Sequence, residues 1–290
     1  IRDVERSRGL GDVYKRQVTD TDRVASWTIH VFDLFDLIVV PSQWCRETLR
    51  RSGVTTPIEV VGHGVSSEFL RKPREPRNKT LIELLRRKRE EKLIYVLFQL
   101  WHSGTRKGAD LVYEVVKRVQ ERYRNVVLVI KRADILDPWL GVLKSLRSVE
   151  VAGWFSEEDM VDLYDICDIY LLFSRGGGFE LPALEALARG EVVLVPEEGS
   201  WIDYCGECVK VRVARREKVF SPTDLAYKVH VGNGVVIDVD DAVKKLSEVI
   251  EHLDEYKEKF AKLAEKVRRE WTWEKQCEKL YNVLKRYKIV

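Results

Sequence analysis

The stretch "IYLLFSRGGGFELPALEALARGEVVLVP" (169–196) contains two apolar runs separated by three glycines and a short helical pattern. Both runs are apolar on both faces, which is typical of buried parallel strands. Pro182 suits the first turn of a helix, and Gly190 suits the position just past its end, where the backbone is left-handed. The stretch therefore predicts a strand, a helix and a second parallel strand.

The three glycines at 176–178 come directly before the predicted helix. Residues without a side chain let a ligand approach the backbone closely, and the first N–H groups of a helix have no partner within it. We therefore expect an anion-binding site at this helix start.

The same alternation continues along the chain. Further apolar runs lie at 37–40, 94–100 and 126–130, with helical patterns at 42–53, 106–123 and 157–167. Alternating strands and helices predict an α/β fold, with a Rossmann-like, doubly wound parallel sheet and right-handed crossovers. Ligands bind such sheets beyond the carboxyl ends of the strands, where the glycines follow the run at 169–173.

Composition narrows the class of protein. The 290 residues are 45% hydrophobic and 33% charged, which suits one large or two modest globular domains. Fifty basic residues against 47 acidic ones give a net charge of +3, so we expect no nucleic-acid partner. The longest apolar run, 94–101, is less than half of the roughly 20 residues that a membrane helix needs. We expect neither a membrane span nor a signal peptide.

Five scattered cysteines indicate reduced thiols and a cytoplasmic protein. The motif "CGEC" (205–208) could be half of a metal site or a redox dithiol, but the sequence offers no second pair or histidine cluster to complete it. We expect two ordinary thiols there.

Two segments of the N-terminal region, residues 1–17 and 62–80, differ in composition from the rest of the chain. The chain begins with Ile1 and its single methionine is Met160, so we expect an N-terminally truncated fragment. Residues 1–17 carry many charges and little periodicity, and they resemble translated adapter sequence found in metagenomic reading frames; we treat them as a non-native or disordered leader. The polar segment at 62–80 predicts an interdomain linker.

The segment "GGGFELPALEALARGEVVLVP" (176–196) resembles the donor site of family 4 glycosyltransferases. In these two-domain GT-B enzymes, two glutamates separated by seven residues frame a G-F-G-x-P stretch. Three other segments resemble the family in order: the end of the first domain and the hinge at 36–65, the phosphate-binding loop and helix at 106–119, and the last helix at 271–281, which in the family crosses back to the first domain.

The resemblance implies a domain plan. Residues 18–66 are the remnant of an N-terminal, acceptor-side Rossmann-like domain, and 67–250 form a complete C-terminal domain that binds the nucleotide sugar. Residues 251–290 are helices that pack back toward the N-terminal part.

Two glutamates carry the main donor contacts in the family. Glu185 matches the second, which accepts hydrogen bonds from the ribose hydroxyls. The first falls on Gly177, whereas Glu180 stands where the family commonly has glycine. Glu180 could supply the missing carboxylate to the donor sugar, or it could be an acid favoured by the dipole at the helix start.

The backbone at the helix start is the second part of the expected donor site. On this interpretation the N–H groups of Gly178, Phe179, Glu180 and Leu181 point at the diphosphate or the sugar hydroxyls.

In the family an arginine and, five residues later, a lysine neutralise the leaving diphosphate. Lys107 matches the lysine, but His102 stands at the arginine position. Arg106 could act as the second cation, with His102 donating a hydrogen bond instead. The alternatives are a surface Arg-Lys pair before a helix and a histidine packed against Trp101.

The stretch "VAGWFSEEDM" (151–160) resembles the loop that receives the nucleotide base. Gly153, Trp154 and Phe155 are expected to line that pocket, although core packing explains the two aromatic residues equally well. Ser156 is expected to be the N-cap of the following helix. We assign His63 to the hinge rather than to chemistry.

The resemblance implies a retaining, metal-independent hexosyltransferase whose co-substrate is a nucleotide-diphosphate sugar and whose acceptor is a glycan, a lipid-linked sugar or a small molecule. The acidic "DVDD" at 238–241 is interpreted as a loop before a helix rather than a metal site. A donor-binding module that lacks catalysis is the alternative. A third hypothesis, peripheral contact with the inner membrane face, rests on the basic segment 71–92.

Overall fold

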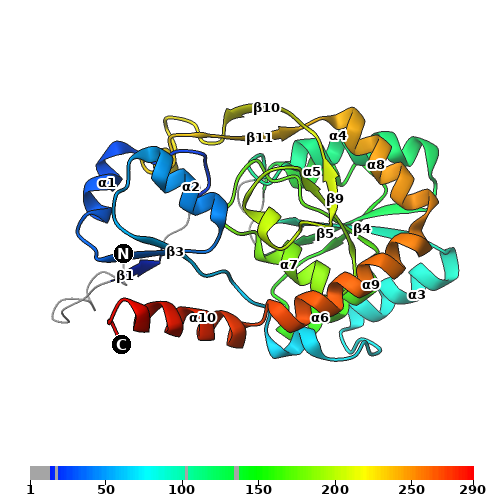
Figure 1. Ribbon diagram of the computed structural model, residues 1–290. Coiled ribbons are helices and arrows are strands. Elements are labelled where there is room, and N and C mark those ends of the chain that lie inside the picture. The colour runs from blue at the N-terminus through cyan, green and yellow to red at the C-terminus, as the bar shows by residue number, and fades with distance from the viewer. Residues whose placement is uncertain (1–13, 17–18, 102–103, 134–136) are drawn as a thin grey trace.

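The computed structural model describes residues 14–16, 19–101, 104–133 and 137–290. A large α/β part contains most of the chain, and a smaller N-terminal part lies beside it (Figure 1). The strands are β1 (Tyr14–Arg16), β2 (Leu37–Val40), β3 (Ile58–Val60), β4 (Ile94–Leu100), β5 (Val126–Arg132), β6 (Ser148–Val151), β7 (Ile169–Leu171), β8 (Val192–Pro196), β9 (Val209–Val211), β10 (Val213–Lys218) and β11 (Asn233–Ile237). The helices are α1 (Ser26–Phe32), α2 (Gln43–Ser52), α3 (Lys79–Glu91), α4 (Ala109–Arg122), α5 (Trp139–Leu143), α6 (Glu157–Ile166), α7 (Leu181–Ala188), α8 (Val239–Glu251), α9 (Leu253–Glu270) and α10 (Trp273–Arg286). The described residues also form the 3₁₀ helices η2 (Ser67–Leu70), η3 (Ser200–Asp203) and η4 (Leu225–Lys228).

The larger part is built on six parallel strands in the order β6-β5-β4-β7-β8-β9. The chain starts this sheet at β4, adds β5 and β6 on one side and then β7, β8 and β9 on the other. The connection therefore reverses direction between β4 and β7. In doubly wound sheets ligands bind at such a point, beyond the carboxyl ends of the strands. The sheet confirms the α/β fold class expected from the sequence.

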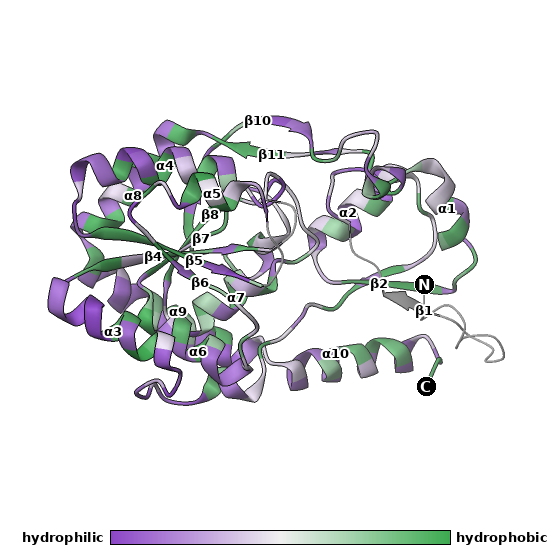
Figure 2. Ribbon diagram, turned by 180° about the vertical axis from the view of Figure 1, so that it is seen from behind, coloured by the Kyte–Doolittle hydropathy of each residue, from purple (hydrophilic) through white to green (hydrophobic). Residues whose placement is uncertain are grey.

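The apolar runs form the core of this part. Every residue of β8 is buried, as is every residue of β4 after the first. Helices cover both faces of the sheet, with their hydrophilic sides outward (Figure 2). Throughout the described part of the chain, each helix is too short or too polar to cross a membrane.

The smaller part has three parallel strands in the order β1-β2-β3, and α2 packs against them. Strand β1 consists of residues 14–16, which the sequence analysis had set apart within the leader. Helix α10 begins where α9 ends at the larger part and runs beneath the smaller part (Figure 1). Val283 and Leu284 of α10 join Leu37, Val39 and Val61 in one apolar cluster. The last helix thus crosses back to the N-terminal part, whereas α9, which belongs to the same predicted segment 251–290, packs against α7 of the larger part.

Two chain crossings lie side by side between the parts. The amide of Val65 donates to the carbonyl of Trp271 at 2.8 Å, and the amide of Trp273 donates to Val65 at 3.2 Å. Gly64 makes this approach possible, because a Cβ there would lie 2.2 Å from the backbone carbon of Thr272. Most of the predicted linker packs onto the larger part, where Phe69 is buried and Arg71 pairs with Asp162.

A third connection was not predicted from the sequence. Strands β10 and β11 form an antiparallel pair, and the loop that joins them reaches the N-terminal part (Figure 1). There the amide of Asp22 donates to Asn233 at 3.0 Å, and that of Ala25 donates to Val229 at 2.9 Å. We call residues 213–237 the arm.

The hinge contact yields a stability prediction. Gly64→Ala places a methyl group against backbone that cannot rotate away, so we expect a loss of about 2–4 kcal/mol in the free energy of unfolding. Gly141→Ala is the matched control, since a Cβ at that helical position meets nothing within 4 Å. Urea denaturation measures both. Equal stability of the two variants would contradict this account of the hinge.

Candidate active site

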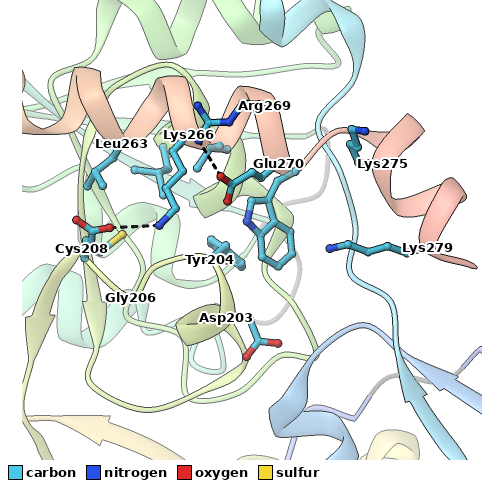
Figure 3. A pocket seen from close by; sticks show the side chains of 14 residues that line it. Asp203, Tyr204, Gly206, Cys208, Leu263, Lys266, Arg269, Glu270, Lys275 and Lys279 are labelled. Carbon is cyan, nitrogen blue, oxygen red and sulfur yellow. Dashed lines mark hydrogen bonds and ion pairs between the residues drawn. The ribbon is translucent and has the colours of Figure 1, made fainter.

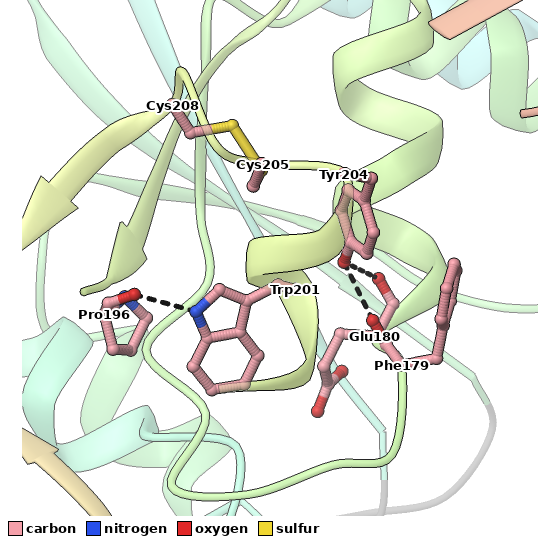
Figure 4. Close-up of a disulfide and its surroundings, with 7 residues drawn as sticks. All are labelled: Phe179, Glu180, Pro196, Trp201, Tyr204, Cys205 and Cys208. Carbon is pink, nitrogen blue, oxygen red and sulfur yellow. Dashed lines mark hydrogen bonds between the residues drawn. A yellow bond between two sulfur atoms is a disulfide. The ribbon is translucent and has the colours of Figure 1, made fainter. Parts of the chain in front are cut away.

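The glycine loop lies at the carboxyl end of β7, next to β4. All five carbonyl groups from residue 176 to residue 180 accept hydrogen bonds from side chains. The donors are Arg106 to Gly176 (3.0 Å), Ser200 to Gly177 (2.6 Å), Ser42 to Gly178 (2.9 Å), and the hydroxyl of Tyr204, whose one proton is shared between Phe179 (2.9 Å) and Glu180 (2.7 Å). The two bonds from Tyr204 are drawn in Figure 4. The carbonyl groups are thereby held by the protein.

The N–H groups of the same loop, unlike its carbonyl groups, have no hydrogen-bond partner in the described part of the chain. Among the residues that the structure describes, none accepts a hydrogen bond from the amides of Gly177, Gly178, Phe179 or Glu180. Helix α7 starts at Leu181, with Pro182 in its first turn. Four donors at a helix start, combined with its dipole, suit an anion. Three of these four, Gly178, Phe179 and Glu180, were among the donors predicted from the sequence, together with Leu181; their role toward a ligand stays a prediction.

Glu180 occupies space that a side chain at position 177 would need. A Cβ on Gly177 would lie 2.2 Å from Oε1 of Glu180 and 2.8 Å from its Cδ. Glu180 also has a left-handed backbone, with φ at 62°, a conformation that favours glycine. The two departures from the family pattern are therefore linked: the glycine makes room for the carboxylate that folds back over it.

The Glu180 carboxylate is paired rather than used as a helix cap. Lys107 donates to both of its oxygens, at 2.8 and 2.6 Å, and Ser174 donates to Oε1 at 2.9 Å. It makes no capping hydrogen bond to α7. Burial acts to raise the pKa of Glu180, but the charge and hydrogen bonds of Lys107, together with the charge of Arg106 and the hydrogen bond from Ser174, outweigh it, so the pKa lies below its usual range. The carboxylate is ionised and points into the site.

Arg106 and Lys107 lie in the turn before α4, where a cavity of about 250 Å³ opens beside the glycine loop. Arg106 lies 3.8 Å from Asp20, which belongs to the N-terminal part and also lines the cavity. Helix α4 begins later than predicted because Gly108, with φ at 79°, passes close to Phe173, leaving no room for a Cβ. The structure thus brings both predicted cations to the predicted loop.

Arg175 is a residue that the sequence analysis missed. It is buried and makes two hydrogen bonds to Asp110, at 2.8 and 2.6 Å, and one to Glu217 of the arm at 2.8 Å. It also donates to the carbonyl of Thr105 at 2.5 Å. Arg175 therefore holds the turn that carries the two cations. The position of Arg175 directly before three glycines is the sequence feature from which it could have been identified as a candidate site residue.

Glu185 lies in the middle of α7, the helix that follows the glycine loop. Tyr164 donates to its Oε2 at 2.8 Å, and Gln99 donates to the Tyr164 hydroxyl at 2.6 Å. Burial raises the pKa of Glu185 to about 7, and the hydrogen bond from Tyr164 only partly opposes this. The chain Gln99–Tyr164–Glu185 fixes the position of a carboxylate that still has free acceptor capacity.

The loop at 153–155 follows β6. Lys131 donates to the carbonyl of Gly153 at 2.5 Å, and its ammonium lies 4.3 Å from the centre of the Phe155 ring. Trp154 is 71% exposed and meets Trp101 edge to face at 5.2 Å. Trp154 is therefore not a core residue, whereas Phe155 packs partly against the core. Ser156 caps α6 by accepting from the amide of Asp159, as predicted.

Two histidines of the sequence analysis have different outcomes. His102 lies outside the residues that the structure describes. His63 lies at the hinge and stacks on Phe179 of the glycine loop, with ring centres 4.8 Å apart. It also contacts Trp273 at 5.5 Å. Its assignment to the hinge agrees with the structure, which places that hinge directly against the loop.

The expectation of ordinary thiols at "CGEC" was wrong. Cys205 and Cys208 form a disulfide that closes the turn between η3 and β9, directly after Tyr204 (Figure 4). The sequence spacing was compatible with a bond, but the reduced state was inferred from chain size and an odd cysteine count. Cys45 and Cys167 are buried and free, and Cys277 is exposed.

Acidic side chains near "DVDD" have structural roles. Asp238 caps α8 by accepting from the amide of Asp241, and Asp240 pairs with Arg118. The prediction of a loop before a helix was wrong for residues 239–241, which form the first turn of α8, with Asp238 as its N-cap directly after β11. In the described ranges, no three histidine, cysteine or carboxylate side chains gather in a group that could hold a metal.

The basic segment 71–92 is largely neutralised. Six of its ten basic residues pair with carboxylates: Arg71, Arg74, Arg86, Arg87, Lys88 and Arg89. These pairs lower the positive charge available to an anionic surface. Peripheral membrane contact stays a prediction.

Comparison with known proteins defines the class of protein to which this chain belongs. Residues 91–211 match the family "Glycosyl transferases group 1". The fold matches trehalose-6-phosphate synthase OtsA with a TM-score of 0.68 at 11% identity, covering 98% of this chain and 69% of that one. An E. coli trehalose-6-phosphate structure bound with UDP-2-fluoro glucose gives 0.62 at 13% identity, covering 86% and 60%. The chain has the GT-B fold and is a glycosyltransferase.

Two viral proteins are similar in sequence. "Uncharacterized protein 356" of Sulfolobus islandicus rod-shaped virus 1 is 31% identical over 255 residues, covering 84% of this chain and 68% of the relative. "Putative glycosyltransferase 45" of Sulfolobus islandicus filamentous virus (isolate Iceland/Hveragerdi) is 29% identical over 238 residues, covering 79% and 61%. The chain belongs to the family of the first of these proteins, and it spans about two thirds of that relative's length.

Glu185 yields a prediction about stability and pH. Because its pKa rises from an ordinary 4.5 to about 7 on folding, it contributes stability below pH 4.5 that is lost as the pH rises through 7. Glu185→Gln removes this penalty, so we expect the variant to exceed the parent by on the order of 2 kcal/mol at pH 8 and by little at pH 4.5. Urea denaturation at both pH values measures the difference.

Glu114→Gln is the control, because Glu114 is exposed on α4. It should show no such pH dependence. A Glu185→Gln variant less stable than the parent at pH 8 would contradict the buried, penalised carboxylate.

Proposed function

We propose that this chain is a family 4 enzyme that transfers a sugar from a nucleotide-diphosphate sugar to an acceptor, with retention of configuration at the anomeric carbon. One observation carries the proposal. Unpartnered N–H groups at the start of α7, two cations before α4 and an ionised carboxylate at Glu180 meet around one cavity at the carboxyl ends of β4 and β7.

The difficult step is departure of the nucleotide diphosphate. As the bond between the anomeric carbon and the phosphate oxygen breaks, its electron pair stays on the diphosphate and positive charge develops on the sugar. Lys107, Arg106 and the start of α7 provide positive charge for the leaving group. The acceptor oxygen then bonds to the anomeric carbon on the same face, and its proton passes to the diphosphate. In this proposal the protein supplies the counter-charge without a metal ion.

The Glu180 carboxylate is proposed to contact the donor sugar. It occupies the space of the absent side chain at Gly177, and Lys107 and Ser174 keep it ionised and fixed. An ionised carboxylate accepts hydrogen bonds from sugar hydroxyls, and it lies near the carbon that becomes positive. This supports the carboxylate role over a simple preference for acids at a helix start.

The residues that contact the ribose and the base of the donor are assigned from their positions in the fold. Glu185 is proposed to accept from the ribose hydroxyls, which is consistent with its free acceptor capacity beside Tyr164. The loop at 153–155 is proposed to receive the base, with exposed Trp154 offering a face for stacking. The UDP sugar in the E. coli neighbour supports a nucleotide-sugar donor.

The acceptor is proposed to enter from the N-terminal side. Asp20, from the N-terminal part, lines the same cavity as Arg106 and Lys107. Because this chain spans only part of its relatives, donor binding without transfer is the second candidate function. A carbohydrate or lipid-linked acceptor and a cytoplasmic location, at most peripheral at the membrane, remain part of the proposal.

A screen of nucleotide-diphosphate sugars by thermal shift tests donor binding. We expect one base and sugar to raise the melting temperature of the parent and to have no effect on Glu185→Ala. The assignment of the donor site is wrong if no compound stabilises the parent at millimolar concentration. Donor hydrolysis and transfer by this chain separate the two candidates, because activity here excludes binding alone.

Exchanging the residues at positions 177 and 180 tests the proposed role of the Glu180 carboxylate directly. Glu180→Gly removes the carboxylate, and we expect a loss of about a hundredfold in kcat/KM. Gly177→Glu combined with Glu180→Gly restores the family arrangement and should recover most of that loss. The double variant also replaces a left-handed glutamate by glycine, so it should fold at least as well as the parent.

Two results would rule out the proposed carboxylate role. One is full activity in Glu180→Gly. The other is a double variant no more active than that single one, with both variants folded by circular dichroism.

A further inference from the structure

A second cavity lies outside the donor site. It has a volume of about 560 Å³ and lies where α9 meets α10, facing η3 and the turn that follows it (Figure 3). Its volume is within the range of small-molecule sites and exceeds the 250 Å³ beside the glycine loop. The two cavities share no lining residue.

The wall of this cavity is apolar and aromatic. Leu187, Leu263, Tyr204 and Trp271 contribute to it, and the rings of Tyr204 and Trp271 lie 5.9 Å apart. The Tyr204 hydroxyl points the other way and holds the carbonyl groups of the glycine loop. A ligand here would therefore rest on the back of the donor loop.

The rim of the cavity is charged, with cations from both helices. In Figure 3, Lys275 and Lys279 come from α10 on one side, and Lys266 comes from α9 on the other. Lys279 lies 5.4 Å from the centre of the Trp271 ring and has no carboxylate partner among the described residues. Within the described part of the chain Lys275 pairs with Glu278 alone, at 3.3 Å, and both side chains are more than half exposed. Exposed pairs of this kind are weak, so both ammonium groups are available to an anion.

Carboxylates complete the rim. Asp203 accepts from the amide of Gln43 at 2.8 Å and keeps further acceptor capacity, and Glu270 pairs with Arg269 at 2.9 Å. Carboxylates accept hydrogen bonds from hydroxyl groups but repel phosphate. The lining thus offers two ammonium groups from α10, carboxylates that can accept hydrogen bonds from hydroxyl groups, and an aromatic wall.

We propose that this cavity is a binding site for a phosphorylated monosaccharide. Lys275 and Lys279 hold the phosphate, Asp203 and Glu270 accept from sugar hydroxyls, and the carbon skeleton packs against Trp271 and Tyr204. Inorganic phosphate alone would leave the apolar wall and the carboxylates unused. The site does not depend on the proposed donor chemistry, because no residue is shared.

Isothermal titration with glucose 6-phosphate, glucose 1-phosphate and fructose 6-phosphate tests the proposal. We expect at least one of them to bind the parent more tightly than inorganic phosphate does. Lys275→Gln/Lys279→Gln should weaken that binding by about tenfold or more, because two charge-assisted contacts are lost. Both lysines are exposed, so the variant should fold, which its melting temperature checks.

Two control variants locate the binding. Lys262→Gln/Lys285→Gln removes the same charge from exposed positions of α9 and α10 outside the cavity and should bind like the parent. Lys107→Gln, in the donor site, should also bind like the parent. The proposal is overturned if none of the three compounds binds the parent, or if Lys107→Gln loses binding while Lys275→Gln/Lys279→Gln retains it. Failure of the donor screen would leave these measurements unaffected.

Discussion

The buried ion pair between Lys107 and Glu180 is the constraint on which the site depends. Taking a carboxylate out of water costs several kcal/mol, and only a close cation with additional hydrogen bonds offsets that cost. Lys107 provides the cation and Ser174 an extra bond. To reach them, Glu180 adopts a left-handed backbone, and position 177 must lack a side chain. One electrostatic requirement thus sets the conformation of the loop, the glycine before it and the place where α7 begins.

Around this pair, aromatic packing ties the donor loop to the parts of the chain that cross between the domains. Phe179 contacts His63 of the hinge, Tyr204 after η3 and Trp271 before α10, with ring centres 4.8 to 5.9 Å apart. Packed rings have few alternative arrangements, so a shift of one partner is felt by the others. The loop that is proposed to hold the donor therefore cannot move independently of the hinge. The arm adds a third tie, since Arg175 joins Glu217 to the turn that carries the cations.

The sequence predicted the parts of this structure that are set by local chemistry. The apolar runs at 94–100 and 192–196 became β4 and β8, and Pro182 and Gly190 correctly marked the ends of α7. What the sequence could not predict arises between distant segments. The space that Glu180 fills over Gly177 depends on a backbone angle, and the arm depends on pairing with residues some 200 positions earlier. The disulfide at Cys205 was missed because compartment and chain size were used to infer the state of a local turn.

A raised pKa alone would not have identified the candidate site. Burial raises the pKa of both Glu185 and Glu191, and it raises that of Glu191 well above its usual range. Glu191 directly precedes β8, at the amino end of the sheet, and neither of its oxygens has a hydrogen bond to a described residue. Glu185 accepts a hydrogen bond from Tyr164, whose hydroxyl in turn accepts one from Gln99 near the carboxyl end of β4. Because an open α/β sheet binds its ligand beyond the carboxyl ends of the strands, position within the sheet separates a donor-binding carboxylate from one that is only buried.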